Sequence, residues 1–295
     1  VGNSYTVTSD TAGADTCAKI QTGIDAVAST GGSVFAQSLA SASCTSKITF
    51  PAISTVSGGG KGVIVYLGIG LSYTGGGTGD FITCATTTDG ATASSCRFSG
   101  LVGLNKHATT IEVGAANATT MDSVVHAKWT THFMIRDLTI ATNAKATYGF
   151  FDEQTADTYM QDVVVRGNVS ANVSGQYAGY FLGSGYGHIF NVHFVGSENS
   201  VRINTTTNVI AAEVRTALGY IASDGQDVHW NNWYNTAALL SWKAGFKVSA
   251  SAAAFKVWEN YFDVFVYGAG ILSAANSDDE SGVHLVEAAV TSTEQ

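Results

Sequence analysis

Short apolar runs recur along residues 146–266, about every 25 to 40 residues, and each contains an Asn or an Asp. These runs are of β-type and cover residues 160–165, 189–194, 230–234 and 257–262, with a further copy at 134–140. Two or three short strands plus their turns fill a unit of this length. The pattern therefore predicts a solenoid in which each coil buries its apolar side against its neighbours.

A glycine followed by an aromatic residue opens four of these copies. Equivalent residues of stacked parallel strands lie about 4.8 Å apart, so we expect the aromatic residues to form one row. The row is either a core stack or an outward platform. Large aromatics are more often buried, and Lys247 directly after the last of them favours the inward orientation in that coil. The row consists of Phe150, Tyr180, Tyr220 and Phe246.

The Asn and Asp residues of the apolar runs form a second predicted column. A tight bend between two strands needs a residue that tolerates left-handed backbone geometry, and stacked Asn side chains can hydrogen-bond along the column. We expect equivalent bends at Asp137, Asp162, Asn191, Asn232 and Asn260.

The N-terminal part carries a different period. Cys17, Ile20, Ile24 and Val27 follow a helical spacing that ends before Gly31-Gly32. A helix across the first coil would cover an open sheet edge. Residues 33–60 are expected to be an insertion between this helix and the strand that starts at Val63.

The glycine-aromatic and Asn columns, together with the N-terminal helix, resemble the pectate lyase-like superfamily, which includes phage tailspikes and polysaccharide-degrading enzymes. The resemblance covers residues 13–272 and implies an all-β fold, a right-handed parallel β-helix with an N-terminal helical cap. We expect a single domain over residues 1–295. It would comprise a lead-in, cap and insertion (1–60), coils (61–272) and a C-terminal tail (273–295).

Composition and charge exclude some classes of binding partner. The 295 residues include only 13% charged residues against 45% apolar ones, which suits an ordered, sheet-rich protein. The formal charge of −9 argues against nucleic acid or an anionic membrane as partner. The longest apolar run, residues 62–71, is too short to span a membrane.

The four cysteines lie in the first third of the chain and fit no metal-binding spacing. Two disulfides, most simply Cys17 with Cys44 and Cys84 with Cys96, are favoured over four buried thiols. Together with four glycosylation sequons they indicate an extracellular or virion-surface protein.

The resemblance implies a polysaccharide along one sheet. Tyr180, Tyr220 and Lys247 are the candidate substrate-binding residues. Asp152 and Glu153, with Asp224 and Asp227 on a comparable turn two coils away, are the candidate acid and base of a glycoside hydrolase, although solvated turn residues are the plainer interpretation.

A polysaccharide lyase is the other enzyme class, in which a cation such as Ca²⁺ would neutralise a uronate; no further cofactor and no metal site is expected. We weigh an extracellular polysaccharide-recognising protein, either a secreted glycan depolymerase or a tailspike-like protein, against a non-catalytic structural or adhesive protein of a virion, surface layer or filament. Either class is compatible with a homo-oligomer, as a trimer or a filament.

Overall fold

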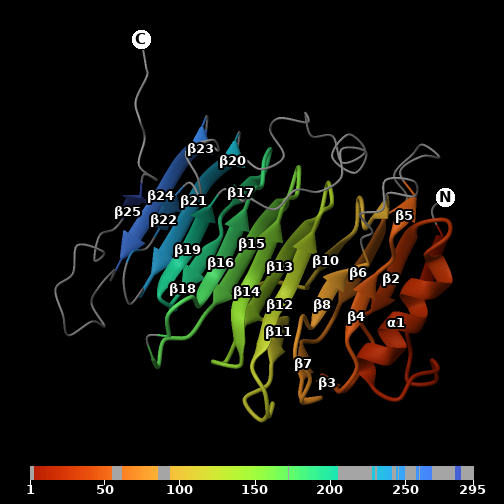
Figure 1. The fold of residues 1–295 in the computed structure, drawn as a ribbon. Helices are drawn as coiled ribbons and strands as arrows, with labels where there is room; N and C mark the ends of the chain where they lie inside the picture. The colour runs from red at the N-terminus through yellow and green to blue at the C-terminus, as the bar shows by residue number, and fades with distance from the viewer. Residues whose placement is uncertain are drawn as a thin grey trace.

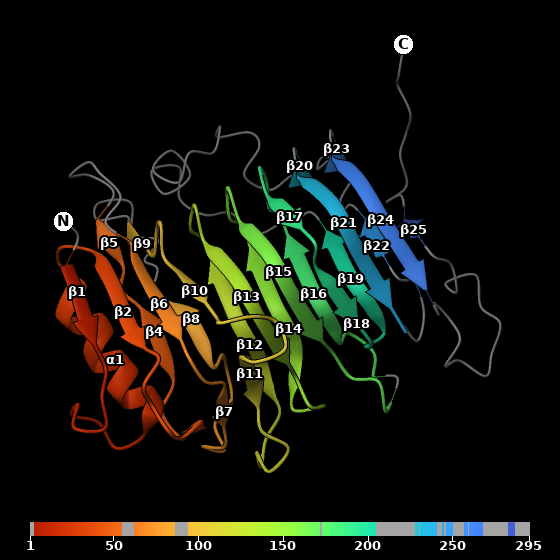
Figure 2. The ribbon, with the colours of Figure 1, turned by 180° about the vertical axis from the view of Figure 1, so that it is seen from behind.

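The computed structural model describes residues 3–54, 62–85, 94–171, 173–204, 228–229, 231–240, 244, 246–249, 257–258, 260–267 and 283–286. Its strands lie side by side along one axis, with the helix α1 (Thr16–Val27) at the N-terminal end (Figures 1 and 2). Within the two large sheets every pairing is parallel, and it joins strands of successive coils. The chain is therefore an all-β parallel β-helix.

The larger sheet has 13 strands and forms two faces of the solenoid. One face contains β1 (Asn3–Thr6), β2 (Gly32–Ala36), β6 (Val63–Leu67), β10 (Gly100–Val102), β13 (Met134–Ala141), β15 (Tyr159–Arg166), β17 (His188–Phe190), β21 (Asn232–Leu239) and β24 (Tyr261–Tyr267). The other face adds β3 (Ser43–Cys44), β7 (Leu71–Tyr73), β11 (Thr110–Val113) and β18 (His193–Val195), which pair with one another or with the second halves of β13, β15 and β21.

The smaller sheet has eight strands and is called the second sheet below. It contains β4 (Ile48–Phe50), β8 (Ile82–Cys84), β12 (Met121–Lys128), β14 (Ala146–Glu153), β16 (Tyr177–Leu182), β19 (Asn199–Asn204), β22 (Phe246–Ser249) and β25 (Val283–Val286). Two short pairs stand apart: β5 (Ile53–Ser54) with β9 (Ser94–Ser95), and β20 (Val228–His229) with β23 (Val257–Trp258).

The core is built from in-register columns of apolar side chains. Successive strands of the larger sheet align one such column, each member of which is at most 1% exposed, because alternate strand residues point to one side. Its members are Val34, Val65, Leu101, Ile135, Met160, Ile189 and Trp233.

The predicted column of bends is confirmed for its first three members. Asp137, Asp162 and Asn191 have positive φ angles of 57°, 54° and 52° and lie between the two faces of the larger sheet. The next member is Asn235 (φ 46°), whose side-chain amide donates to Asn191 Oδ1 over 3.2 Å. Asn191 in turn donates to Asp162. The column thus has the amide-to-oxygen hydrogen bonds that were expected of it.

Asn232 and Asn260 were assigned wrongly to this column. Asn232 pairs with His188 and Tyr261, three residues before the bend. Asn260 accepts a hydrogen bond from the Asn231 side chain over 2.9 Å. Asn231 lies directly before the start of β21, whereas the bend lies in the middle of this strand. Several Asn residues follow one another closely here, and only the register decides which of them adopts the left-handed geometry.

The predicted aromatic row is corrected by the register of the second sheet. Phe150 pairs with Gly179, whereas Tyr180 pairs with Phe151, so the two glycine-aromatic copies are offset by one residue. Phe150 and Phe246 face the core and are 0% and 1% exposed, as expected for an inward aromatic. Tyr180 is half-buried on the opposite, outer side, and Tyr220 lies outside the described residues.

The N-terminal helix is confirmed. Cys17, Ile20, Ile24 and Val27 are buried, and the Asp15 side chain caps the helix by accepting from the backbone N–H of Ala18 over 2.8 Å. The other Asp15 oxygen accepts from the backbone N–H groups of Thr45 and Ser46 over 2.6 and 2.8 Å. Burial alone would raise the pKa of Asp15, but these hydrogen bonds outweigh it and lower the pKa to about 2.

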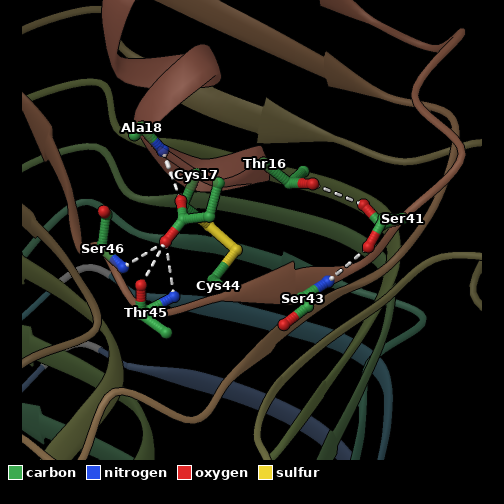
Figure 3. The surroundings of a disulfide bond; sticks show 9 residues. Thr16, Cys17, Ala18, Ser41, Ser43, Cys44, Thr45 and Ser46 are labelled. Atoms are coloured by element: carbon green, nitrogen blue, oxygen red, sulfur yellow. Dashed lines mark hydrogen bonds between the residues drawn. A yellow bond between two sulfur atoms is a disulfide. The ribbon is translucent and has the colours of Figure 1, made fainter. Parts of the chain in front are cut away.

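Both predicted disulfides are present. Cys17 of the helix bonds Cys44 of β3, next to Thr45 and Ser46 (Figure 3), and Cys84 bonds Cys96. The first disulfide fastens the cap to the first coil. Among the described residues no cysteine is free.

The expected insertion is part of the solenoid instead. β2 begins directly after Gly31 and pairs with β6 over its whole length, while β3 and β4 pair with β7 and β8. The first coil therefore starts at Gly32, earlier than the predicted residue 61. At the other end β25 pairs with β22, beyond the expected last coil residue 272. No described helix is long and apolar enough to cross a membrane.

Candidate functional site

The outer face of the second sheet carries one row of aromatic and basic side chains. Strand register places one member of this row on each of five successive strands, β12, β14, β16, β19 and β22, with a spacing of about 4.8 Å. The row runs along the solenoid axis through His126, Phe151, Tyr180, Arg202 and Lys247.

Four aromatic rings lie together around this row. Tyr148 and Tyr177 are stacked with ring centroids 5.9 Å apart, and Phe151 and Tyr180 are stacked at 5.2 Å. The two pairs touch, because the Tyr148 centroid lies 5.0 Å from that of Phe151 and the Tyr177 centroid 5.4 Å from that of Tyr180. All four side chains are half-buried, so each presents part of its surface to solvent. We call them the aromatic cluster.

The glycines of the repeat explain how these rings meet. In β14, Gly149 and Phe150 are both buried, so that the flanking Tyr148 and Phe151 share the outer side. A Cβ atom on Gly149 would lie 2.5 Å from Val165 Cγ1, and one on Gly179 would lie 2.4 Å from Phe194 Cε1. Only glycine leaves room there for the core side chains.

The tyrosine hydroxyl groups are protonated at neutral pH. Burial, helped by the neighbouring Tyr180, Tyr177 and Asp122, raises the pKa of Tyr148 to about 12. Burial likewise raises the pKa of Tyr177 and of Tyr180. These groups can therefore donate hydrogen bonds to a ligand but do not serve as bases.

A carboxylate–imidazole–carboxylate chain adjoins the aromatic cluster. His126 Nδ1 lies 2.8 Å from Asp80 Oδ2, and its Nε2 lies 3.1 Å from Glu153 Oε2. Asp80 also accepts from the Ser123 hydroxyl over 2.7 Å. The imidazole ring stacks on Phe151 at 4.3 Å, which fixes its plane.

The two carboxylates favour the charged form of His126. Burial alone would lower its pKa, but the hydrogen bonds that it donates to Asp80 and Glu153 outweigh burial, so the pKa is raised above 6.5. The pKa of Asp80 is lowered, because its contact with His126 outweighs the effect of burial. Both ring nitrogens face acceptors, which is the arrangement of an imidazolium that donates twice. His126 thus holds Glu153 in place.

Glu153 is the predicted acidic residue that reaches this face. It follows Asp152 in β14, pairs with Lys128 and Leu182 on the outer side, and is 9% exposed. One of its carboxyl oxygens, Oε2, contacts His126 Nε2.

Asp152 was predicted as a catalytic residue and is instead a core residue. It pairs with Ala127 and Phe181 and is 0% exposed, so it cannot touch a ligand on the outer face. Its Oδ1 accepts from the hydroxyls of Thr155 and Ser184, in the turns of two successive coils. Its Oδ2 is buried without a hydrogen-bond partner, and burial raises the pKa of the group to about 6.

The remaining predicted residues divide into two sets. Tyr180 and Lys247 lie on the outer row, separated only by Arg202. Asp224, Asp227 and Tyr220 lie outside the described residues, so the predicted pairing with Glu153 stays a prediction.

Sequence reasoning missed Asp80 and His126, which come from separate coils and form no local motif. The described residues contain no group of three or more His, Cys, Asp or Glu side chains that could hold a metal ion.

Comparison with known proteins gives little sequence similarity. No family model and no curated protein matches the chain. A solved structure that resembles it is the A-module of a mannuronan C-5 epimerase from Azotobacter vinelandii, with 11% identity over 92% of this chain and 96% of that chain, at a TM-score of 0.22. At this level the likeness bears on neither activity nor ligand.

Proposed function

We propose that the chain is a polysaccharide-recognising β-helix protein that binds a glycan on the outer face of the second sheet. The observation that carries this proposal is the aromatic cluster, half-exposed and directly beside the Asp80–His126–Glu153 chain. The C–H faces of sugar rings pack on aromatic rings, while hydroxyl and carboxylate groups bond sugar hydroxyls. The cluster and its neighbours offer both kinds of contact.

The direction of the row suggests how the glycan lies. His126, Phe151 and Tyr180 occupy successive coils, so the row is parallel to the solenoid axis and perpendicular to the strands. A linear glycan lying along this row would meet a new side chain at each coil.

The stacked coils also support membership of the pectate lyase-like superfamily, and the two disulfides support an extracellular location.

A glycan depolymerase is the second candidate function. It is favoured by the way Asp80 and His126 orient Glu153, since an acid–base group must be held in position beside its substrate. Glu153 would be the proton-transferring residue, and Asp224 or Asp227 is the proposed partner carboxylate. The depolymerase could also be a polysaccharide lyase, in which a single base would take the place of the carboxylate pair.

Affinity gel electrophoresis with a panel of soluble acidic and neutral polysaccharides tests the binding proposal. Wild type should be retarded by at least one polysaccharide, and the double variant Tyr177→Ala/Tyr180→Ala should bind it at least about tenfold more weakly. Tyr66→Ala is the matched control, because Tyr66 is a half-buried tyrosine on the outer side of the larger sheet, stacked on Phe35. Retardation by none of the panel, or equal retardation of the double variant, would contradict the proposal.

Release of new sugar ends from the polysaccharide that binds tests the second candidate. Glu153→Gln should remove this activity while leaving the retardation unchanged. Wild type that binds the glycan without cleaving it would reject the depolymerase and leave a non-catalytic adhesive or structural protein. Full activity of Glu153→Gln would show that Glu153 is not the proton-transferring residue.

A further inference from the structure

A second group of exposed aromatic rings lies on the larger sheet, on three successive coils near the C-terminal end. Phe190, Tyr234 and Tyr261 are 45%, 42% and 53% exposed, whereas most large apolar side chains of the described residues are buried. Phe190 pairs directly with Tyr234 on the neighbouring strand. The Tyr261 ring lies 5.1 Å from the Tyr234 ring, on the next strand again. We call these three side chains the outer aromatic strip.

Hydrogen-bonding side chains flank the strip. Asn191 follows Phe190 and Asn235 follows Tyr234, and the two amides form an exposed pair at 3.2 Å. On the opposite flank His188 and Asn232 occupy the ladder that leads to Tyr261, with His188 exposed and Asn232 half-buried. The coils of Phe190 and Tyr234 thus each present an aromatic ring with an amide or imidazole beside it.

The charged groups around the strip differ from those on the outer face of the second sheet, where Arg202 and Lys247 lie in the row. Among the described residues, the two ladders that contain the strip hold no Lys or Arg over β15, β17, β21 and β24, and the Asp162 and Asp263 carboxylates lie at the adjacent bends. The cation that continues one of these ladders is Arg136 on β13, two strands away from Phe190. Acidic neighbours disfavour an anionic ligand. Rings at a spacing of about 4.8 Å per coil, flanked by amide and imidazole groups, suit an uncharged chain of sugar rings.

We propose that Phe190, Tyr234 and Tyr261 form a second glycan-binding site, specific for uncharged polysaccharide and separate from the face of the aromatic cluster. The strip lies on the larger sheet and contains no acid–base pair, so it would hold a glycan without acting on it. Two sites on different faces let one molecule engage two chains or two parts of one chain, which raises the overall avidity.

Affinity gel electrophoresis with uncharged polysaccharides (hydroxyethylcellulose, galactomannan, dextran and mixed-linkage β-glucan) tests this site. Wild type should be retarded by at least one of them, and Tyr234→Ala/Tyr261→Ala should bind it at least about tenfold more weakly. Phe190→Ala should weaken binding in the same direction. Tyr66→Ala on the same sheet should bind as wild type. Thermal unfolding of each variant shows that the fold is retained.

The two proposed sites fail separately in this experiment. Retardation by uncharged polysaccharides that persists in Tyr234→Ala/Tyr261→Ala but is lost in Tyr177→Ala/Tyr180→Ala would overturn the second site and leave the first. Retardation by acidic polysaccharides alone would also overturn it. Self-association that is lost in Tyr234→Ala/Tyr261→Ala, with no retardation by any uncharged polysaccharide, would identify the strip as a contact between two copies and overturn the glycan site.

Discussion

Asp152 brings a carboxyl group into the core of the solenoid, where one of its oxygens finds hydroxyl partners and the other finds none. Two neighbours that it binds, Thr155 and Ser184, belong to turns of adjacent coils, so the side chain links the coils from inside. An ionised carboxylate in this position is costly because water no longer solvates it. Asp152 therefore links adjacent coils through its hydroxyl partners, while its buried position disfavours the ionised carboxylate.

Asp152→Asn should stabilise the protein at neutral pH. The pKa of Asp152 is raised from 3.8 to about 6, so its stabilising effect is complete below pH 3.8 and is lost as pH rises through about 6. The full difference corresponds to about 3 kcal/mol, and an amide keeps the acceptor for Ser184. Urea unfolding should show the variant about 1 to 3 kcal/mol more stable at pH 7, with the gain vanishing near pH 4. Asp122→Asn, at an exposed position of the same sheet, is the control and should change little. A destabilised Asp152→Asn at pH 7 would contradict this account.

His126 and His193 should titrate on opposite sides of pH 6.5. The Asp80 and Glu153 carboxylates raise the pKa of His126, whereas burial and the nearby Lys106 and His107 lower that of His193. A raised pKa means that His126 stabilises the fold fully below pH 6.5 and loses this effect as pH rises through its folded-state pKa. NMR titration of the imidazole carbons should give the two midpoints in that order. A His126 midpoint below that of His193 would show that the chain does not hold an imidazolium.

The bends show what sequence could and could not predict at the scale of an element. Asp137, Asp162 and Asn191 were found because the runs around them align without ambiguity. The fourth bend was missed because Asn231, Asn232 and Asn235 lie within five residues, and nothing local states which one turns. The same limit explains the offset aromatic row: a shift of one residue moves a side chain to the other face, so Tyr180 faced outward while Phe150 faced the core.

Asn191→Ala should therefore cost far more stability than Asn232→Ala. Asn191 holds a left-handed conformation, which costs most residues about 1 to 2 kcal/mol, and it hydrogen-bonds both neighbouring coils. We expect Asn191→Ala to lower the free energy of unfolding by about 2 to 4 kcal/mol. Asn232→Ala should stay within about 0.5 kcal/mol. Equal losses in the two variants, measured by urea unfolding, would restore the original assignment of the column.

The N-terminal end of the solenoid is closed by a cap that is held in place by three kinds of contact. The apolar side of α1 packs on the first coil, Asp15 bonds the β3–β4 turn, and the Cys17–Cys44 disulfide joins the same two segments. The sequence predicted this cap from a helical period and a cysteine spacing. It missed the Asp80–His126–Glu153 chain, because its residues come from three strands or turns that only the stacking of coils brings together.

Removal of the cap disulfide should destabilise the protein. Cys17 and Cys44 are 27 residues apart, and closing a loop of this length is worth about 3 kcal/mol in the chain-entropy model. Cys17→Ser/Cys44→Ser should lower the free energy of unfolding by about 2 to 4 kcal/mol. Intact mass spectrometry of the unreduced wild type should show the loss of four hydrogens. Free thiols in the native protein would contradict both the pairing and the argument for an extracellular location.

Hydroxyl-radical footprinting, with and without a saturating polysaccharide that the protein binds, measures whether a glycan covers the outer face of the second sheet. The labelling of an aromatic side chain falls when a ligand covers it. If a glycan lies along the outer face of the second sheet, labelling of Tyr148, Phe151, Tyr177 and Tyr180 should fall together, while the control Tyr66 on the larger sheet stays unchanged. Unchanged labelling of the aromatic cluster in the presence of a bound glycan would contradict the proposed function.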